Sequence, residues 1–442
     1  KSQVYNSYDE INIKGVISLS HTNDISKLLN LKDPNIFFKD SCVSEECMKG
    51  IRVKVFEGTL TYLPSECPKC AHEQDGQIIH YGFKTTLIKV PSVAGFAAFL
   101  RLKKQRCLCK HCGRTFTLKT TVVKENCSIA QSTKLAIALD LKQKISEKDL
   151  AQKHNVSATT VMRIVDDAFK LYRPSPNDLP EALCFDEFKS VKSAKGAMSF
   201  VYCDAKTSEI IDIVEDRRLA VLIRYFSRFT KAARHGVKYI VIDMYAPYMT
   251  LIKKLFPRAA LIIDRFHSVG LLNRALNQTR IQVMKDQEKE ASKFKKFWRL
   301  FLKERSQVDD QTRYYQRTFK RYMTSREVLD ELLTRDNKLA ATYDFYQTFL
   351  YTIKKRDVGL LEKMLHGDLN SLSPQMITAA KTLRKQEPHL LNSLIYPYHN
   401  GRIEGLNNKI KVIKRIAFGY KSFLHFRNRI LITQGILKIK AA

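Results

Sequence analysis

The chain has 442 residues, enough for two to four domains with their own cores. Its apolar content of 44% is ordinary for a globular protein, and the absence of a long apolar run argues against a membrane protein. Lys and Arg total 76 against 44 Asp and Glu, and the net charge of +32 favours a polyanionic partner, of which nucleic acid is the usual one. The first residues lack the apolar core of a signal peptide. We therefore expect a cytoplasmic, nucleoid-associated protein that binds DNA and no membrane.

Residues 1–62 give few structural signals, and we assign them no role. A short helix at 25–30 and a strand at 52–62 are expected there.

Residues 63–120 contain two cysteine pairs, CPKC at 67–70 and CKHC at 109–112, with apolar, Thr-rich, strand-like pieces between them. Two such pairs can close a tetrahedral thiolate site, so this spacing predicts a zinc ribbon. The expected ligands of a structural Zn²⁺ are Cys67, Cys70, Cys109 and Cys112. Cys107 lies close to the second pair and leaves the choice of ligands there open.

Residues 121–175 predict a helix-turn-helix domain. Ser146 with Asp149 resembles a capping box, Asn155 occupies the turn, and Ser157 begins the next helix. In this arrangement the last helix reads the major groove, although similar patterns occur in bundles that bind no DNA. We expect the DNA-contacting residues to be Ser157, Thr159, Thr160 and Arg163.

Three prolines at 173–180 mark a linker, after which strands and helices alternate. Three strands in hairpin order, then helix, strand, helix and strand, are typical of a ribonuclease-H-like sheet. The predicted spatial strand order is 3-2-1-4-5. Residues 272–395 have helical spacing and few breakers, which predicts an all-helical insertion. The fold class is thus multidomain α+β and α/β, with the ribonuclease-H-like domain at 176–442.

Carboxylates end the apolar strands of this domain. Asp186, Asp243 and Asp264 each follow such a run, and a carboxylate there is costly unless it is paired or binds a metal. Glu404 lies on a basic helix, on one face with residues that suit a phosphate backbone, namely Asn408, Lys411 and Arg415. Hard oxygen ligands suit Mg²⁺ or Mn²⁺, and two such ions can clamp an in-line phosphoryl displacement. A surface glutamate paired with lysine is the ordinary alternative.

The motifs FDEF at 185–188, DMYAPY at 243–248, DRFH at 264–267 and GRIEGLNNKIKVIKRIAFGY at 401–420 resemble those of the ISL-three family of bacterial insertion-sequence transposases. The resemblance also covers the cysteine and helix-turn-helix regions. It implies a DDE catalytic triad at Asp186, Asp243 and Glu404. It further implies binding of terminal inverted repeats, cleavage by water, and joining of the freed 3′-hydroxyl to target DNA.

Asp264 lies one strand further from Asp186 than Asp243 does, so we assign Asp243 to the triad. Asp264 and His267 are expected to stand behind the metal ligands or to contact DNA, with structural hydrogen bonding as the alternative. Trp298, the single tryptophan, is expected in the core, and stacking on an unpaired base is its other possible role.

Two other functions stay open. A DNA-binding repressor with an idle sheet domain would not need three carboxylates at these places, and a nuclease that cuts without joining is not separable by sequence. We expect a homodimer or larger assembly on DNA.

Overall fold

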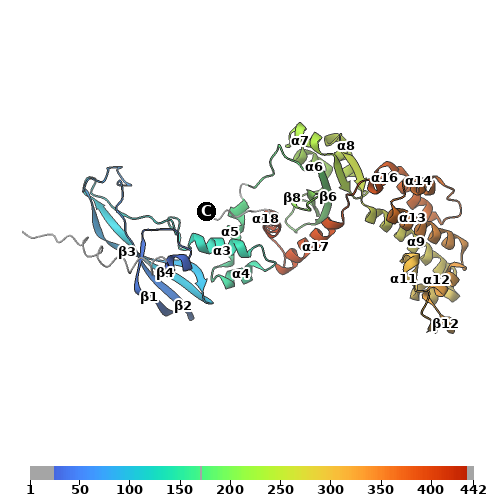
Figure 1. Cartoon of the computed structure of the whole chain (residues 1–442), viewed down its shortest axis with the longest axis horizontal. Helices are drawn as coiled ribbons and strands as arrows, with labels where there is room; N and C mark the ends of the chain where they lie inside the picture. Colours follow the sequence, from blue (N-terminus) through green and yellow to red (C-terminus); the bar gives the residue numbers. More distant parts are fainter. Residues whose placement is uncertain (1–23, 170–171, 436–442) are drawn as a thin grey trace, which may run out of the picture. The chain divides into compact units, whose positions relative to one another are not determined.

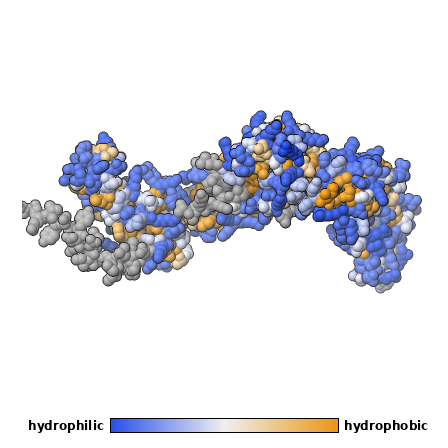
Figure 2. Space-filling view, turned by 45° about the horizontal axis from the view of Figure 1, so that its top comes forward, coloured by the Kyte–Doolittle hydropathy of each residue, from blue (hydrophilic) through white to orange (hydrophobic). Residues whose placement is uncertain are grey.

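The computed structural model describes residues 24–169 and 172–435, which fall into two compact units. The first unit comprises Lys1–Leu171, Ile413–Gly419 and Asn428–Ala442, and the second comprises Tyr172–Val412 and Tyr420–Arg427. The domain expected at 176–442 therefore gives two C-terminal segments to the first unit. Hydrophilic residues cover most of the molecular face shown in Figure 2.

The first unit contains a five-stranded sheet, which is followed in the chain by a group of helices (Figure 1). Its strands are β1 (Ile36–Met48), β2 (Ile51–Leu60), β3 (Ile78–Val93), β4 (Phe96–Cys109) and β5 (Thr115–Thr117). The order is β1-β2-β4-β3, with β5 paired to β4. Ala94 and Gly95 join β3 to β4 with φ of 51° and 81°, the positive values that a tight hairpin turn requires.

Residues on both sides of the boundary expected after residue 62 pair in one sheet, because β2 and β4 run in parallel from Val53↔Ala97 to Leu60↔Lys104. Residues 36–60 therefore belong to the same sheet as the cysteine motifs. One apolar core joins both parts, with Phe38 and Phe56 beside Leu100.

Three helices follow at the expected places, α3 (Gln131–Asp140), α4 (Glu147–Lys153) and α5 (Ala158–Phe169). Ser146 accepts the Asp149 N–H at 3.1 Å and caps α4. Arg429 of α18 (Phe423–Thr433) is 1% exposed and donates to the carbonyl oxygens of Gln143 and Ile145 at 3.1 and 2.8 Å. This contact fixes the loop between α3 and α4, and it explains why the C-terminal residues belong to this unit.

The second unit is built on a sheet of order β10-β9-β6-β7-β8. In chain order this is 5-4-1-2-3, so the predicted strand order is confirmed. The strands are β6 (Ala182–Lys189), β7 (Met198–Asp204), β8 (Ile210–Val214), β9 (Tyr239–Ile242) and β10 (Ala260–Ile263). The connecting helices are α6 (Leu219–Phe226), α7 (Lys231–Gly236) and α8 (Ala246–Leu255). The rings of Phe185, Phe200, Phe226 and Tyr248 meet in the core between sheet and helices.

A mainly helical segment separates β10 from α17 (Gly401–Ile416). Its α-helices are α9 (Arg265–Asp286), α10 (Ala291–Lys296), α11 (Trp298–Leu302), α12 (Ser325–Leu333), α13 (Asn337–Lys355), α14 (Val358–His366), α15 (Pro374–Lys385) and α16 (Glu387–Ile395). The expectation of an all-helical insertion at 272–395 needs two corrections. The first helix begins at Arg265, and a hairpin of β11 (Tyr314–Gln316) and β12 (Arg321–Met323) interrupts the helices. Its tyrosines favour strands.

Candidate functional site

Three carboxylates stand level at the end of the parallel part of the second sheet. Cys184 of β6 pairs with Val241 of β9, and Ile263 of β10 pairs with Ile242 of β9. Continuing each register past its last pair puts Asp186 and Asp264 on either side of Asp243. Neighbouring strands lie about 4.8 Å apart, so each outer carboxylate is within reach of the central one.

His267 joins two of these carboxylates. Its Nδ1 lies 2.9 Å from Asp243 Oδ1 and 3.1 Å from Asp264 Oδ2. The hydrogen bonds to Asp243 and Asp264 raise the pKa of His267 to about 10, which favours the protonated ring. Asp264 and His267 were expected to stand behind the metal ligands or to contact DNA, with structural hydrogen bonding as the alternative, and the structure shows both His267 contacts. The three residues form a group whose ligand atoms are all within 4.8 Å of one another.

Asp186 has a different environment. The pKa of Asp186 is raised to about 7. Burial is the largest cause, the hydrogen bond from the backbone N–H of Glu187 acts in the opposite direction, and the charge of Asp243 adds to the increase. Asn407 of α17 donates from Nδ2 to Asp186 Oδ2 at 2.8 Å. This hydrogen bond holds α17 against β6 and favours the ionised carboxylate.

Asn400, just before α17, is 4% exposed and was not predicted from the sequence. Its backbone N–H donates to Asp264 Oδ1 at 3.3 Å, and its Nδ2 lies 3.5 Å from Asp243 Oδ1. Among the described residues, the Oδ1 atoms of Asn400 and Asn407 have no hydrogen-bond partner. The Asn407 side chain thus ties α17 to Asp186, while the side chain and backbone N–H of Asn400 tie the residue before α17 to Asp243 and Asp264.

Helix α17 presents the other predicted residues. Ile403, Leu406, Ile410 and Ile413 form its buried face. Outside that face it exposes Glu404, Asn408, Lys411 and Arg415. Asp186, Asp243 and Glu404 are not among the groups of described residues whose ligand atoms all lie within 4.8 Å of one another. Glu404 is nevertheless one helical turn before Asn407, the residue that contacts Asp186.

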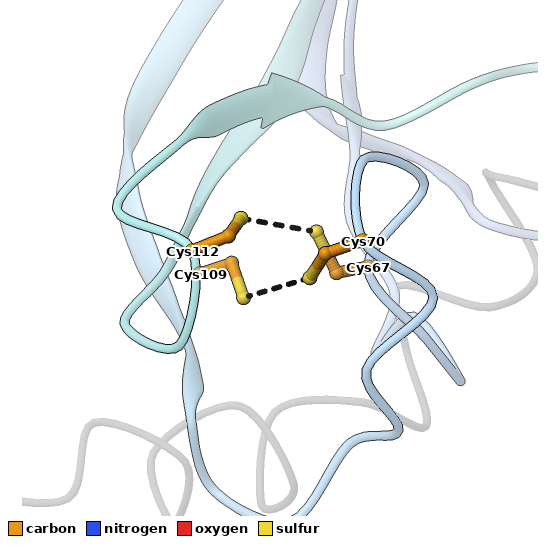
Figure 3. Close-up of side chains that lie close together, drawn as sticks. All are labelled: Cys67, Cys70, Cys109 and Cys112. Atoms are coloured by element: carbon orange, nitrogen blue, oxygen red, sulfur yellow. Dashed lines mark hydrogen bonds between the residues drawn. The ribbon is translucent and has the colours of Figure 1, made fainter.

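Four cysteines form a second cluster, in the first unit. Cys67 and Cys112 have sulfurs 3.9 Å apart, and so do Cys70 and Cys109 (Figure 3). All four offer sulfur atoms within 4.8 Å of one another, which suits a tetrahedral thiolate site for zinc. Burial raises the pKa of the Cys67 thiol, but the backbone N–H groups of Lys69 and Cys70 outweigh it, and the pKa falls to about 7.

Cys107 is outside this cluster. It lies buried within β4 and accepts a hydrogen bond from Gln105 Nε2 at 3.5 Å. Cys107 is absent from the four-cysteine group among the described residues, which favours Cys109 and Cys112 as the ligands of the second pair.

Helix α5 carries the predicted DNA-reading residues. Val161 and Val165 are buried, whereas Thr159 and Arg163 are exposed and Thr160 is partly exposed. Ser157 accepts the Thr160 N–H at 3.2 Å, as a helix cap does. Asn155 takes a positive φ of 49° in the turn before it. Trp298 is 39% exposed and is not a core residue, with the Arg299 guanidinium 5.5 Å from its ring.

Three carboxylates at the end of the parallel part of this sheet, together with a four-cysteine cluster, are the features of a DDE transposase with a zinc ribbon. A family model described as "Transposase", of the ISL3 group of DDE transposases, matches residues 183–430, and a model described as "zinc-finger of transposase IS204/IS1001/IS1096/IS1165" matches residues 63–112. The chain belongs to the ISL3 family of DDE transposases.

Two curated proteins are similar over part of their length. The "Transposase for insertion sequence element IS1001" of Bordetella parapertussis is 26% identical over 274 residues, 59% of this chain and 61% of that protein. An "ATP-dependent protease" of Lactococcus lactis subsp. lactis is 39% identical over 114 residues, 26% of this chain and 36% of that protein. The chain therefore spans less than two thirds of either relative.

Among solved structures, the "Drosophila P element transposase strand transfer complex" aligns with 69% of this chain and 77% of that chain, at 12% identity and a TM-score of 0.22. This likeness is too low to support an argument about fold or function. No helix among residues 24–169 and 172–435 is both long and apolar enough to cross a membrane.

Proposed function

We propose that the chain binds the terminal inverted repeats of an insertion sequence, cleaves the DNA at those ends and joins the freed 3′-hydroxyls to target DNA. The observation that carries this proposal is the level placement of Asp186 and Asp243 on neighbouring parallel strands, with α17 held beside them by Asn407. Membership of a transposase family supports the same chemistry.

The donor set fits divalent cations. Mg²⁺ and Mn²⁺ prefer carboxylate oxygens, and the raised pKa of Asp186 is that of a buried carboxylate near a like charge, which a cation would relieve. When bound, two such ions would activate water or a 3′-hydroxyl and stabilise the leaving oxygen. The residues that would hold them are Asp186, Asp243 and Glu404.

His267 supports the choice of Asp243 over Asp264 as the partner of Asp186. Its imidazolium already lies between Asp243 and Asp264 and neutralises charge there. Among the described residues, Asp186 makes no ion pair with His267, although the charge of His267 lowers the pKa of Asp186. Asn400 and Asn407 would orient the carboxylates, and Asp264 would position His267.

DNA recognition is assigned to two surfaces, one on α5 and the other on α17. On α5, Thr159, Thr160 and Arg163 would read the major groove, while Ser157 would lie near a phosphate. On α17, Asn408, Lys411 and Arg415 would contact the phosphate backbone. The net charge of +32 supports both assignments. A homodimer or larger assembly would hold two ends together.

The test uses the full chain, Mg²⁺ or Mn²⁺, and a labelled duplex made from the DNA that flanks its gene. Cleavage at the element end, followed by transfer of the label to a plasmid, is the expected result. Cleavage without transfer would indicate a nuclease, and end-specific binding without cleavage would indicate a repressor. Asp186→Asn should bind the end and cut nothing.

A further inference from the structure

The hairpin β11–β12 carries an exposed aromatic pair that neither the fold nor the proposed chemistry uses. Tyr315 and Tyr322 face each other across the two strands, with ring centroids 5.4 Å apart in an edge-to-face arrangement. Their exposed fractions are 53% and 66%, and neighbouring Tyr314 is 58% exposed. Exposed rings gathered in this way usually mark a binding surface.

The hairpin is fixed to the helical segment from its other side. Met323 is 2% exposed and belongs to the core, and Phe319 in the turn packs on Phe297 with centroids 5.9 Å apart. Lys293 lies 4.7 Å from the Phe319 ring. These contacts hold the hairpin against α10 and against Phe297, which follows it. The tyrosine pair is therefore presented on a supported strand pair, which lowers the ordering cost of binding.

The charged residues of the hairpin are all basic. Residues 313–323 include Arg313, Arg317, Lys320 and Arg321 and no Asp or Glu. Arg313 pairs with Glu327 at 2.6 Å and Arg321 pairs with Glu331, so these two guanidinium groups bind α12. Arg317 and Lys320, at the exposed tip, are left to face a polyanion.

We infer that the β11–β12 hairpin binds single-stranded DNA, with Tyr315 and Tyr322 stacking on unpaired bases while Arg317 and Lys320 contact phosphates. Aromatic rings beside cationic side chains are the usual means of holding single strands without regard to sequence. The inference rests on the proposed function only in taking DNA as the partner. In that setting the hairpin would hold bases that lose their partners when an element end is opened.

The test measures binding of the full chain to a labelled single-stranded oligothymidylate and to a blunt duplex without an element end. The double variant Tyr315→Ala/Tyr322→Ala should bind the single strand roughly a hundredfold more weakly, because each of the two stacked bases contributes about a factor of ten, and it should bind the duplex almost as the parent does. Tyr315→Phe/Tyr322→Phe keeps the rings and should retain affinity. Tyr351→Ala removes a 54% exposed tyrosine elsewhere in the helical segment and should change nothing.

A crosslinking experiment tests the same contact directly. An oligothymidylate with one 5-iodouracil, irradiated in complex with the parent, should crosslink to the peptide that contains Tyr315 or Tyr322. Unchanged single-strand affinity of the double alanine variant would overturn the inference, and so would equal losses on single strand and duplex. Loss of a dimer in sedimentation, with DNA binding intact, would assign the tyrosines to a protein interface and also overturn it.

A further comparison of variants tests the role of charge. The double variant Arg317→Gln/Lys320→Gln is compared with Lys338→Gln/Lys381→Gln, which removes two exposed lysines on α13 and α15. Only the first pair should weaken single-strand binding and flatten its salt dependence. If the parent chain cleaves no element end but still binds the single strand in a tyrosine-dependent way, the result counts against the proposed function alone.

Discussion

Asn407 donates a hydrogen bond from Nδ2 to Oδ2 of Asp186 across 2.8 Å, joining residues 221 positions apart in the chain. Through this bond the helix that carries Glu404 is attached to the strand that carries the first carboxylate of the proposed triad. Asn407 contacts the carboxylate and not the reacting DNA, so we regard it as a positioning residue.

Asn407→Ala should therefore lower DNA cleavage by about ten- to a hundredfold, the usual effect of removing a partner that orients a metal-binding carboxylate. Affinity for the DNA end should stay the same, because the Asp186 contact does not involve DNA. Cleavage would be measured over a Mg²⁺ titration, where higher Mg²⁺ should recover part of the loss. Asn337→Ala, at the exposed start of α13, is the matched control, and an equal effect there would refute the positioning role.

A pair of conservative variants distinguishes the role of Asp243 from that of Asp264. Asp243→Asn should abolish cleavage at any Mg²⁺ or Mn²⁺ concentration, because it removes a proposed metal ligand. Asp264→Asn should leave measurable cleavage, since His267 would keep its contact with Asp243. DNA binding by both variants is confirmed first by gel shift. The reverse pattern of activities would move the metal site to the Asp243–Asp264 side.

The elements that were predictable from the sequence have strong local signals. The apolar runs before Asp186, Asp243 and Asp264 indicated buried strands, and the strand order followed from the order of strands and helices. β1 was missed because its side chains are mostly exposed and its pattern is not apolar. The β11–β12 hairpin was missed because its two strands have only three residues each and lie among helices.

The two asparagines of the candidate site could not have been found in this way. Asn400 and Asn407 carry no charge and belong to no periodic pattern, and their roles depend on partners that are 157 and 221 positions away. By contrast, the cysteine pairs could be interpreted directly, because metal-ligand spacing is itself a local pattern.

The zinc prediction has a control within the same strand. Cys109→Ser should remove zinc and destabilise the first unit, because a structural zinc site contributes directly to folding. Cys107→Ser alters a buried cysteine two residues away that is outside the cluster, and it should keep its zinc. Metal analysis of both variants, with the parent at one zinc per chain, is the measurement. Zinc retained in Cys109→Ser and lost in Cys107→Ser would mean that the ligand set is wrong.

Asp140 links the helices of the predicted helix-turn-helix domain. Its Oδ2 lies 2.7 Å from His154 Nε2 and 2.9 Å from Lys153 Nζ, and the Asp140 side chain is 18% exposed. Burial raises the pKa of Asp140, but the hydrogen bonds and charges of Lys153 and His154 outweigh it and hold the pKa below its usual value. The ion pair should therefore stabilise α4 against α3 only while Asp140 is ionised.

The sign of the pH dependence follows from this lowered pKa. A carboxylate with a lowered pKa adds stability that is fully present above its unfolded pKa of about 3.9 and is lost as the pH falls through the folded value. Asp140→Asn should thus lower the free energy of local unfolding of α4 by about 1 kcal/mol at pH 7, as removal of a partly buried ion pair does. At pH values below the pKa of Asp140 in the folded chain, the substitution should change this free energy by almost nothing. The measurement is backbone amide hydrogen exchange in α4 of the full chain. The variant is compared with the parent from pH 7 down to pH values below the folded pKa of Asp140. A difference that is the same at both ends of the range would show that Asp140 acts through packing and not through its charge.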